Sequence, residues 1–560
     1  MDQAPRILGI NRTQDASICL MRGSRLEWAI QKERLTRQKH HWGRTGDVAG
    51  VYAARLPGLD QPLDVLVECY SSDPEQDKLA VYEQELAATI RMAPLSRRAQ
   101  ISHHLAHAYS AFHPSPFASA AVMIVDGQGS PVSSLTEHWS GAGTADPNWC
   151  EVASYYHADR ARVSCIAKQV WNRDEQRLVG LGMFYFLLTQ AIFPGHGNEG
   201  KVMGLAPHGN PYVLGLPALQ VDGCQVTIPS AWTDILHTRG RFRYLGRDDL
   251  RFADIAALAA AGQRAFENAL VKVATWLQRE TGAEDLCFAG GTALNCSANQ
   301  RLLRETGFRR VFIPPAPSDA GTALGCAIYG LTELAGQPCD FRWQNDYLGP
   351  EQSLADIDMV LAGARDLQIE CLEEPQAMSE RIVDLIEAGM VVGLFQGRSE
   401  FGPRALGHRS ILGDPRPAAM RDWINDRVKQ REWFRPLAPI VLLEYAERYF
   451  DINAASPFMQ FAAPVRADAA SLIAAVTHVD RTARLQTVGP HDDPLLRSLL
   501  ETFHARTGTP VLLNTSFNGK DEPIVETPAE ALDTFRQTPM DALAMPPYLI
   551  RKRVTPDRSA

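Results

Sequence analysis

The sequence predicts an α/β protein with mixed sheets, because short apolar strands alternate with helical segments along its 560 residues. Two consecutive segments, residues 285–306 and 309–330, repeat one plan of apolar strand, glycine turn and helix. Hydrophobic residues make up 45% of the chain and charged residues 22%, which is typical of a globular protein. At this length, two or three domains are expected rather than one.

The expected elements follow one another from the N-terminus. Residues 6–11 predict a strand, and residues 18–23 and 25–35 predict two more, joined by a turn at Gly23. A further strand is expected at 64–70 and an amphipathic helix at 74–92. Residues 99–102 lead into a short histidine-rich helix, and residues 120–130 predict a buried strand that ends in a glycine turn. A long helix ends near Thr281, ahead of the two repeated segments.

The composition changes after about residue 345. Residues 344–353 (QNDYLGPEQS) resemble a linker, and a second α/β unit follows, with a helix at 378–389 and a strand at 390–397. We therefore expect two domains, residues 1–350 and 351–560, with the boundary between 345 and 370.

Charge and targeting signals exclude several classes of protein. The net charge of −9 provides no basic field, so no nucleic-acid partner is expected. The N-terminus, MDQAPRILGIN, lacks the basic and apolar regions of a signal peptide. The longest apolar stretch, residues 181–194, is too short to span a bilayer, so no membrane partner is expected. Ten cysteines without a C-x-x-C pair favour buried thiols in a reducing cytoplasm, and we expect a cytoplasmic protein.

Three histidines lie close together in the stretch ISHHLAHA at residues 101–108. His103 and His107 are four positions apart, so a helix places them on one face, whereas His104 points about 100° away from His103. Imidazole is a common metal ligand, but a buried helix with hydrogen-bonded histidines is the simpler alternative. A metal site would need carboxylates from elsewhere in the chain. Asp126 and Asp319 follow apolar strands and are candidates, although either could cap a helix or form a turn.

Three strand-to-turn segments contain glycine, at residues 9–17, 125–130 and 288–295. Glycine allows backbone N–H groups to approach a phosphate closely, although ordinary turns also contain it. Three such turns in this order resemble the architecture of sugar kinases, Hsp70 and actin. In that architecture two turns hold phosphates and a later glycine pair packs on adenosine.

Arginines are concentrated between Arg398 and Arg435, where nine Lys/Arg residues face five Asp/Glu residues. A solvated helical face explains Arg421 and Arg427. Arg398, Arg404 and Arg409 instead fall in a segment broken by glycine and proline, where guanidinium groups suit phosphate oxygens.

A set of longer motifs resembles one family. It includes HHLAHA at 103–108, VDGQG at 125–129, GNEGKVMGLAPHG at 197–209, GGTALNCSANQ at 290–300, GRSEFGPRALGHRSILGDPR at 397–416 and LNTSFNGKDEPIVETP at 513–528. These motifs resemble the O-carbamoyltransferases, which act on nodulation factors and on antibiotics such as tobramycin, cephalosporins and ansamycins. The resemblance extends from Ile7 to Tyr548 in the order found in the family.

The resemblance implies a function for each domain. The first would be a duplicated actin-like domain similar to the metal-dependent tRNA threonylcarbamoyladenosine synthases. Its metal ligands would be His103, His107, Asp126 and Asp319, with Fe(II) expected and zinc or manganese also compatible. The second would be a YrdC-like domain that makes carbamoyl-adenylate from carbamoyl phosphate and Mg-ATP.

The resemblance also carries specific residues. Nucleotide in the first domain would lie near Asp15, Gly127, Gly129, Lys201, Gly290, Gly291, Asn295 and Gly321. Carbamoyl phosphate and ATP in the second would contact Arg398, Arg404, Arg409, Ser410, Lys429, Arg431, Arg435, Arg484, Asn514, Ser516 and Asn518. Catalytic roles are expected for Lys39, Arg404, Lys429 and Ser516. An exposed loop position is the alternative for Lys39 and Lys201, and a turn-forming role is the alternative for Asn514, Ser516 and Asn518.

The expected reaction is ATP-dependent transfer of a carbamoyl group to a hydroxyl group of a small molecule. An antibiotic-like secondary metabolite is the first candidate acceptor, and a sugar of a signalling oligosaccharide is the second. The sequence leaves the acceptor and the oligomeric state open, including a homodimer. One position departs from the family: Gln14 replaces the usual histidine, and an amide cannot act as a general base near neutral pH.

Three other classes compete with this interpretation. A tRNA threonylcarbamoyl transferase fits the metal motif, but not the fusion of both domains without a basic surplus. A hydrogenase maturation factor would carry an acylphosphatase domain and paired C-x-x-C motifs, which the sequence lacks. A non-enzymatic nucleotide-binding module of actin-like architecture would not need the C-terminal arginines.

Overall fold

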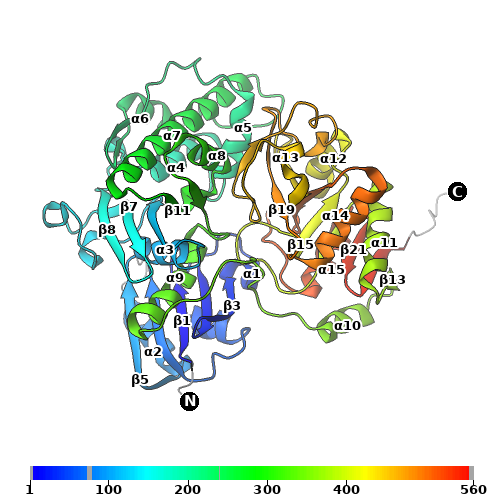
Figure 1. The fold of residues 1–560 in the computed structure, drawn as a ribbon, viewed down its shortest axis with the longest axis horizontal. Helices are drawn as coiled ribbons and strands as arrows, with labels where there is room; N and C mark the ends of the chain where they lie inside the picture. The colour runs from blue at the N-terminus through cyan, green and yellow to red at the C-terminus, as the bar shows by residue number, and fades with distance from the viewer. Residues whose placement is uncertain (1–3, 72–77, 239, 554–560) are drawn as a thin grey trace. The chain divides into compact units, whose positions relative to one another are not determined.

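The computed structural model describes residues 4–71, 78–238 and 240–553. The chain divides into two units, Met1–Gln344 and Asn345–Ala560 (Figure 1). The first unit contains two five-stranded sheets with helices packed on them, and the second contains one eight-stranded sheet.

The first sheet of the N-terminal unit has the order β3-β2-β1-β4-β5. Its strands are β1 (Arg6–Asn11), β2 (Ser17–Arg22), β3 (Arg25–Gln31), β4 (Leu63–Cys69) and β5 (Met92–Ile101). β1, β2 and β3 form an antiparallel meander, while β4 and β5 extend the sheet in parallel. The expected turn at Gly23 is confirmed, with a φ of +55° that favours glycine.

The second sheet repeats this arrangement, with the order β12-β11-β6-β7-β8. Its strands are β6 (Ser119–Val125), β7 (Cys150–Asp159), β8 (Val163–Trp171), β11 (Asp285–Ala289) and β12 (Arg310–Phe312). β6, β7 and β8 are antiparallel, and β11 and β12 are added in parallel. The two sheets therefore share strand order and direction.

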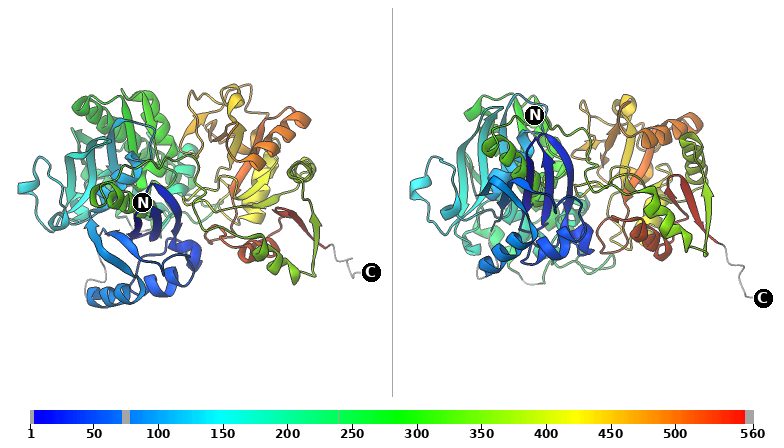
Figure 2. Two further views of the ribbon diagram at one scale, coloured as in Figure 1. Left: turned by 60° about the horizontal axis from the view of Figure 1, so that its bottom comes forward. Right: turned by 90° about the horizontal axis from the view of Figure 1, so that it is seen from below.

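Two helices pack together between these sheets. α9 (Thr322–Tyr329) lies on the first sheet and α3 (His103–Phe112) on the second, and the two helices contact each other. Figure 2 shows the blue first sheet and the cyan second sheet on opposite sides of these helices. The helices approach so closely that a Cβ on Gly325 would lie 1.8 Å from the carbonyl oxygen of Ala106. Glycine in α9 therefore permits the contact that brings α3 and α9 together.

The remaining helices of this unit cover the outer faces. The outer face of the first sheet packs against α2 (Leu79–Thr89) and the π-helix Val48–Ala53, through Tyr52, Tyr82 and Leu86. A helical layer stands on the second sheet (Figure 1). It consists of α4 (Leu181–Ile192), α5 (Glu199–Leu205), α6 (Ser230–Leu236), α7 (Phe252–Thr281) and α8 (Cys296–Glu305), with the small hairpin β9 (Gln220–Asp222) and β10 (Gln225–Thr227).

The C-terminal unit is built on a mixed sheet of order β13-β22-β21-β14-β15-β20-β16-β19. Its strands are β13 (Leu367–Cys371), β14 (Val392–Phe395), β15 (Arg409–Gly413), β16 (Ala438–Leu442), β19 (Gln486–Val488), β20 (Val511–Ser516), β21 (Ala542–Met545) and β22 (Tyr548–Lys552). α11 (Pro375–Glu387) and α14 (Pro494–Thr507) pack side by side on one face and bury Ile382, Ile386 and Phe503 (Figure 1). The smaller elements are α10 (Leu354–Ala362), α12 (Ala418–Trp423), α13 (Ala446–Tyr449), α15 (Pro528–Gln537), β17 (Ala462–Pro464) and β18 (Thr482–Arg484).

Most predicted elements are confirmed, with three differences in extent. The strand expected over 25–35 ends at Gln31, because α1 (Lys32–Thr36) begins there with residues that favour a helix. The segment before the histidine helix forms a long strand, β5, rather than the short connecting segment expected at 99–102. The helix expected at 74–92 is observed as α2, and its expected start lies outside the described residues. Among the described residues, no helix is both long and apolar enough to cross a bilayer, and all ten cysteines are free thiols.

Candidate functional site

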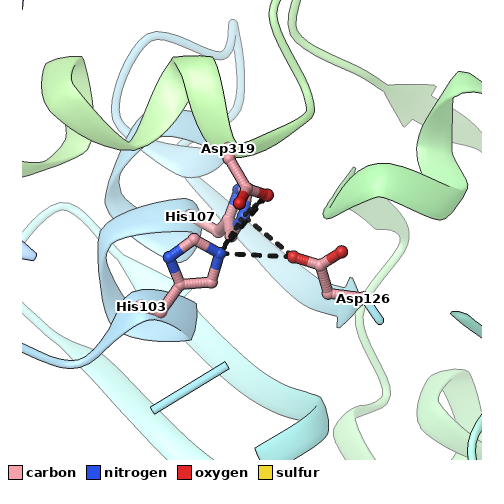
Figure 3. A group of neighbouring side chains, drawn as sticks. All are labelled: His103, His107, Asp126 and Asp319. Atoms are coloured by element: carbon pink, nitrogen blue, oxygen red, sulfur yellow. Dashed lines mark hydrogen bonds and ion pairs between the residues drawn. The ribbon is translucent and has the colours of Figure 1, made fainter. Parts of the chain in front are cut away.

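Four side chains from three parts of the first unit converge on one point (Figure 3). His103 and His107 come from α3, Asp126 follows β6, and Asp319 begins the 3-10 turn that leads into α9. One nitrogen or oxygen atom from each lies within 4.8 Å of all the others. His103 Nε2 is 3.3 Å from Asp126 Oδ2 and 3.4 Å from Asp319 Oδ1, and His107 Nε2 is 3.4 Å from Asp126 Oδ2. The sequence thus brings together the four residues expected to bind a metal.

Local hydrogen bonds hold each carboxylate in place. Asp126 Oδ1 accepts the backbone N–H groups of Gly127 and Gly291, at 2.8 and 3.1 Å, which leaves Oδ2 facing the imidazoles. Asp319 Oδ2 accepts the Thr13 hydroxyl at 3.1 Å. The N-caps of the 3-10 turn and of α9 are Ser318 and Gly321, so Asp319 caps neither of them and lies inside the turn instead, as the turn alternative expected.

The cluster concentrates negative charge around two imidazoles. Burial lowers the pKa of His103, but the Asp319 and Asp126 carboxylates raise it well above its usual value. Burial raises the pKa of Asp126, but hydrogen bonds from the two imidazoles lower it well below its usual value. Burial also raises the pKa of Asp319, but the charge of His103 and hydrogen bonds from the two imidazoles lower it below its usual value. The cluster therefore favours positive charge beside its two carboxylates. Two imidazole nitrogens and two carboxylate oxygens suit a divalent transition metal, including Fe(II), Zn²⁺ and Mn²⁺.

His104 lies outside this cluster and belongs to a buried network behind it. His104 Nδ1 is 2.8 Å from Ser154 Oγ, and Glu151 Oε1 accepts its backbone N–H at 3.0 Å. Lys168 Nζ lies 2.6 Å from Glu151 Oε2 and 2.9 Å from Glu137 Oε1, so the buried charges are paired. This network anchors the first turn of α3. Glu151 and Lys168 were not predicted from the sequence, where the one signal for them is a charged residue inside each apolar strand.

The glycine turns have a packing explanation in addition to the predicted nucleotide role. A Cβ on Gly129 would lie 2.6 Å from Glu151 Cγ, and one on Gly290 would lie 2.3 Å from the Val125 carbonyl oxygen. A Cβ on Gly321 would lie 2.1 Å from the Ala316 carbonyl oxygen, whereas Gly127 has open space at that position. The nucleotide role of these glycines remains a prediction.

The other residues expected near nucleotide in this unit have different surroundings. Asn295 exchanges amide hydrogen bonds with Gln263, at 2.9 and 3.0 Å, and caps α8 through the Ala298 N–H. Lys39 is exposed in a loop, and Lys201 is half-buried on α5. Asp15 lies in the turn between β1 and β2 and contacts His40.

In the second unit, Lys429, Ser516 and Asn518 come together. Lys429 is buried, and its Nζ donates to Asn518 Oδ1 at 2.6 Å and to Ser516 Oγ at 3.2 Å. It also reaches the backbone carbonyls of Ser516 and Asn518, at 2.8 and 3.0 Å. A lysine from the end of one helix is thus held at the end of strand β20, beside a hydroxyl and an amide.

Three of the predicted arginines also gather in this unit. Burial lowers the pKa of Arg431 well below its usual value, and the nearby charges of Arg435 and Arg484 lower it further. Burial and Arg484 likewise lower the pKa of Arg435, although Glu432 opposes this shift. The Arg435 side chain is still 26% exposed, so solvent reaches it. Like charges held close together in this way favour the binding of an anion.

Four other predicted residues have their polar groups bonded within the protein. Arg409 is fully buried, donates to the carbonyls of Gln396 and Gly397 at 2.6 and 3.0 Å, and stacks on Phe395. Arg398 donates to the carbonyls of Gly349 and Leu348, and Ser410 Oγ accepts the Gly407 N–H. Asn514 is buried and donates to the Ala405 carbonyl. These contacts give the four residues partners within the protein, and their predicted contacts with carbamoyl phosphate or ATP stay predictions. Arg404 is half-buried in the same turn.

The fold and the two groups of side chains describe an α/β protein of two units. The first unit contains a buried histidine–aspartate cluster, and the second contains a buried lysine and three neighbouring arginines. The family description "Carbamoyltransferase N-terminus" matches residues 65–328, and "Carbamoyltransferase C-terminus" matches residues 383–552. The chain belongs to the carbamoyltransferase family.

Curated relatives agree with this assignment. Nodulation protein NolO of Bradyrhizobium diazoefficiens is 36% identical over 81% of this chain and 79% of its own length. Nodulation protein NolNO of Sinorhizobium fredii is 37% identical over 82% of this chain. The matched region covers only 64% of the length of that relative. The 3'-hydroxymethylcephem-O-carbamoyltransferase of Amycolatopsis lactamdurans is 34% identical over 43% of this chain and 44% of its own length.

Solved structures are more distant. HypF of T. kodakarensis has a TM-score of 0.32 and 13% identity, over 60% of this chain and 48% of that chain. Similarity at this level supports no conclusion about the chemistry of either unit.

Proposed function

We propose that this protein is an ATP-dependent O-carbamoyltransferase that activates a carbamoyl group in its second domain and transfers it to a hydroxyl group in its first. One observation carries the proposal. Each half of the family description matches one unit, and each matched region contains a buried centre of distinct chemistry. The relative named as an O-carbamoyltransferase supports a hydroxyl acceptor.

The activation step would use the basic groups of the second domain. Water hydrolyses carbamoyl phosphate to carbamate and inorganic phosphate. A carbamate oxygen then attacks the α-phosphorus of Mg-ATP, and pyrophosphate leaves. Arg431, Arg435 and Arg484 neutralise the phosphates, since their clustered charges favour a bound anion. Lys429 and Ser516 lie together at the end of β20 and would contact the reacting carbamate or α-phosphate. A mixed anhydride with AMP has a better leaving group than carbamate itself.

The transfer step would use the first domain. His103, His107, Asp126 and Asp319 would hold the divalent metal, which when bound supplies a Lewis acid to an oxygen of the carbamoyl-adenylate. The hydroxyl oxygen attacks the carbamoyl carbon, and AMP leaves. The shared strand order of the two sheets supports a duplicated, actin-like domain, in which the glycine turns at 127–129 and 290–291 would lie near the AMP moiety.

Product analysis tests the scheme. Incubation with carbamoyl phosphate, ATP and an accepted alcohol is expected to yield AMP and pyrophosphate together with a carbamate ester. ADP as the sole nucleotide product would refute it. Mass spectrometry of small-molecule extracts treated with enzyme, ATP and carbamoyl phosphate would identify the acceptor as a compound that gains one carbamoyl unit.

The alternative, a non-enzymatic nucleotide-binding module, is distinguished by carbamoyl transfer and nucleotide binding in the Arg404→Ala variant. If both domains form one enzyme, Arg404→Ala abolishes carbamoyl transfer because activation fails. A module that only binds nucleotide in its first domain would retain that binding and would show no carbamoyl transfer in the unaltered protein either.

A further inference from the structure

Two turns of the first unit bring a histidine and an aspartate together outside the metal cluster. Asp15 lies in the turn between β1 and β2, and His40 lies in the loop that follows α1. His40 Nδ1 is 2.8 Å from Asp15 Oδ1, with side chains that are 28% and 18% exposed. An imidazole that donates Nδ1–H to a carboxylate presents its Nε2 lone pair on the opposite edge.

The backbone fixes this pair at some conformational cost. Asp15 and His40 have φ angles of +49° and +54°, in the left-handed region that costs most residues about 1 kcal/mol. The backbone N–H of His40 donates to Glu33 Oε2 at 2.9 Å, which holds the loop against α1. Unfavourable backbone angles retained at two partner residues are typical of functional sites.

The His40 ring packs beside a glycine at its Nε2 edge. A Cβ on Gly197, whose φ is +75°, would lie 2.0 Å from His40 Nε2. Any larger residue would therefore occupy the space in front of that nitrogen. Within the described part of the chain, no hydrogen bond to this nitrogen is found.

The pair is also tied to the metal cluster. Asn11 Nδ2 donates to the backbone carbonyl of Asp15 at 3.2 Å and to that of Asp319 at 2.9 Å. The same turn supplies the Thr13 hydroxyl to Asp319 Oδ2. One short turn thus positions both the His40–Asp15 pair and one of the four metal-binding side chains.

We propose that His40 is the general base of the transfer step and that Asp15 is its positioning residue. The proposal rests on the function proposed above. His40 Nε2 takes the proton of the acceptor hydroxyl as its oxygen bonds to the carbamoyl carbon. The bond from that carbon to the AMP oxygen then breaks, and AMP leaves with the electron pair. The imidazolium afterwards returns its proton to solvent. Gln14, in the same turn, cannot accept this proton, so the chain needs another base.

The charges around His40 set the expected pH dependence. Asp15 and Glu33 face it from the turn and from α1, Glu199 faces it from α5, and Lys39 precedes it. Burial and Lys39 lower the pKa of His40, but Asp15 and Glu33 raise it above 6.5 overall. Only neutral imidazole accepts a proton, so transfer should fail as the pH falls through a value above 6.5.

The test compares His40→Asn with His41→Asn in the full-length chain. His41 is the neighbouring imidazole, and its Nδ1 lies 2.7 Å from the Thr36 hydroxyl, away from Asp15. Two probes are supplied with carbamoyl phosphate and ATP: a 3'-hydroxymethylcephem alcohol, and hydroxylamine, whose nitrogen attacks without a base. Pyrophosphate release is followed separately as the readout of activation.

The expected result separates the two nucleophiles. His40→Asn reduces carbamoylation of the alcohol by about 10²- to 10⁴-fold, while pyrophosphate release and hydroxyurea formation stay within about twofold of the unaltered protein. His41→Asn retains all three. Asp15→Asn lowers alcohol transfer and moves its acid limb to lower pH. Alcohol transfer by His40→Asn within about twofold of the unaltered protein, with the same acid limb, would overturn the proposal.

Nitrogen-15 NMR of the histidine rings decides the question without any acceptor. At pH 8, the signals lost in His40→Asn should report a proton on Nδ1 and none on Nε2. The opposite tautomer would overturn the proposal, whichever alcohol is used. Failure of the proposed function gives a different result, because the unaltered protein would then release no pyrophosphate and form no hydroxyurea.

Discussion

The Nε2 atoms of His103 and His107 lie only 3.2 Å apart, and both face the Asp126 and Asp319 carboxylates. The two rings are nearly perpendicular, with centroids 4.7 Å apart. Two N–H groups could not point at each other at this distance, so at most one proton lies between the nitrogens. Two imidazole nitrogens and two carboxylates that face one point are a candidate site for a cation.

Replacement of His107 by alanine is expected to remove the metal. The remaining three ligands leave one side of the site open, so the metal content should fall from about one ion per chain to about a tenth of that or less. Carbamoyl transfer should fall with it, whereas pyrophosphate release by the second domain should continue. Metal analysis of the purified full-length protein measures the first effect.

His157→Ala is the matched control for this experiment. His157 lies on β7, and its Nε2 contacts the Ser119 hydroxyl rather than any of the four clustered side chains. Its loss should leave the metal content unchanged. Equal metal content in His107→Ala and the unaltered protein would show that these four side chains do not bind the ion.

Arg435→Ala is expected to weaken activation in the second domain. Its guanidinium lies near Arg431 and Arg484, where an anion would relieve the repulsion between them. A charged hydrogen bond lost from bound phosphate is worth about 1.5–3 kcal/mol, so kcat/KM for ATP should fall about 10- to 100-fold. Pyrophosphate release at varied ATP concentration gives this value.

Arg427→Ala serves as the comparison. Arg427 is 70% exposed and pairs with Asp426 at 3.1 Å, as expected of a solvated helical face. Its removal should leave kcat/KM unchanged. A similar loss of kcat/KM in both variants would mean that the whole segment acts through its net charge rather than through the cluster of Arg431, Arg435 and Arg484.

Arg409 should behave differently, because its effect is on stability. Its buried guanidinium donates to backbone carbonyls, so Arg409→Met leaves those acceptors without a partner. The free energy of unfolding of the second unit should fall by about 3 kcal/mol. Arg416→Met removes a 38% exposed side chain paired with Asp414 and should cost less than about 1 kcal/mol. Urea denaturation compares the two, and equal midpoints would contradict the structural role of Arg409.

The contrast between Arg409 and Arg435 shows what the sequence could predict and what it could not. Both lie in one basic segment. Local composition cannot distinguish a guanidinium that donates to backbone carbonyls from one that lies among other arginines. That distinction depends on β15, which places Arg409 inside the sheet. The metal cluster was easier to predict, because the spacing of His103 and His107 fixes their common face on any helix.

The pairing of sequence-distant residues was the harder part of the site. Asp319 joins His103 because α3 and α9 pack closely through Gly325, a contact visible only once both sheets are folded. The His40–Asp15 pair was likewise missed, since two loop residues 25 positions apart carry no periodicity. The strands were predictable because apolar runs ending in glycine turns signal them locally.

Acidification should destabilise the first unit through His113. Burial and the nearby Arg160 and Arg342 lower the pKa of His113 to about 4, from an ordinary value of 6.5. Above pH 6.5 the ring is neutral in both the folded and the unfolded chain, so it contributes nothing to the pH dependence of the free energy of unfolding. Between pH 6.5 and 4 the unfolded chain binds a proton that the folded chain does not, so stability falls by up to about 3 kcal/mol. His113→Phe cannot titrate and keeps a ring beside Tyr109, so its melting temperature should fall less over this range. The exposed His491→Gln should follow the unaltered protein, and parallel curves for all three would exclude His113 as a source of the acid sensitivity.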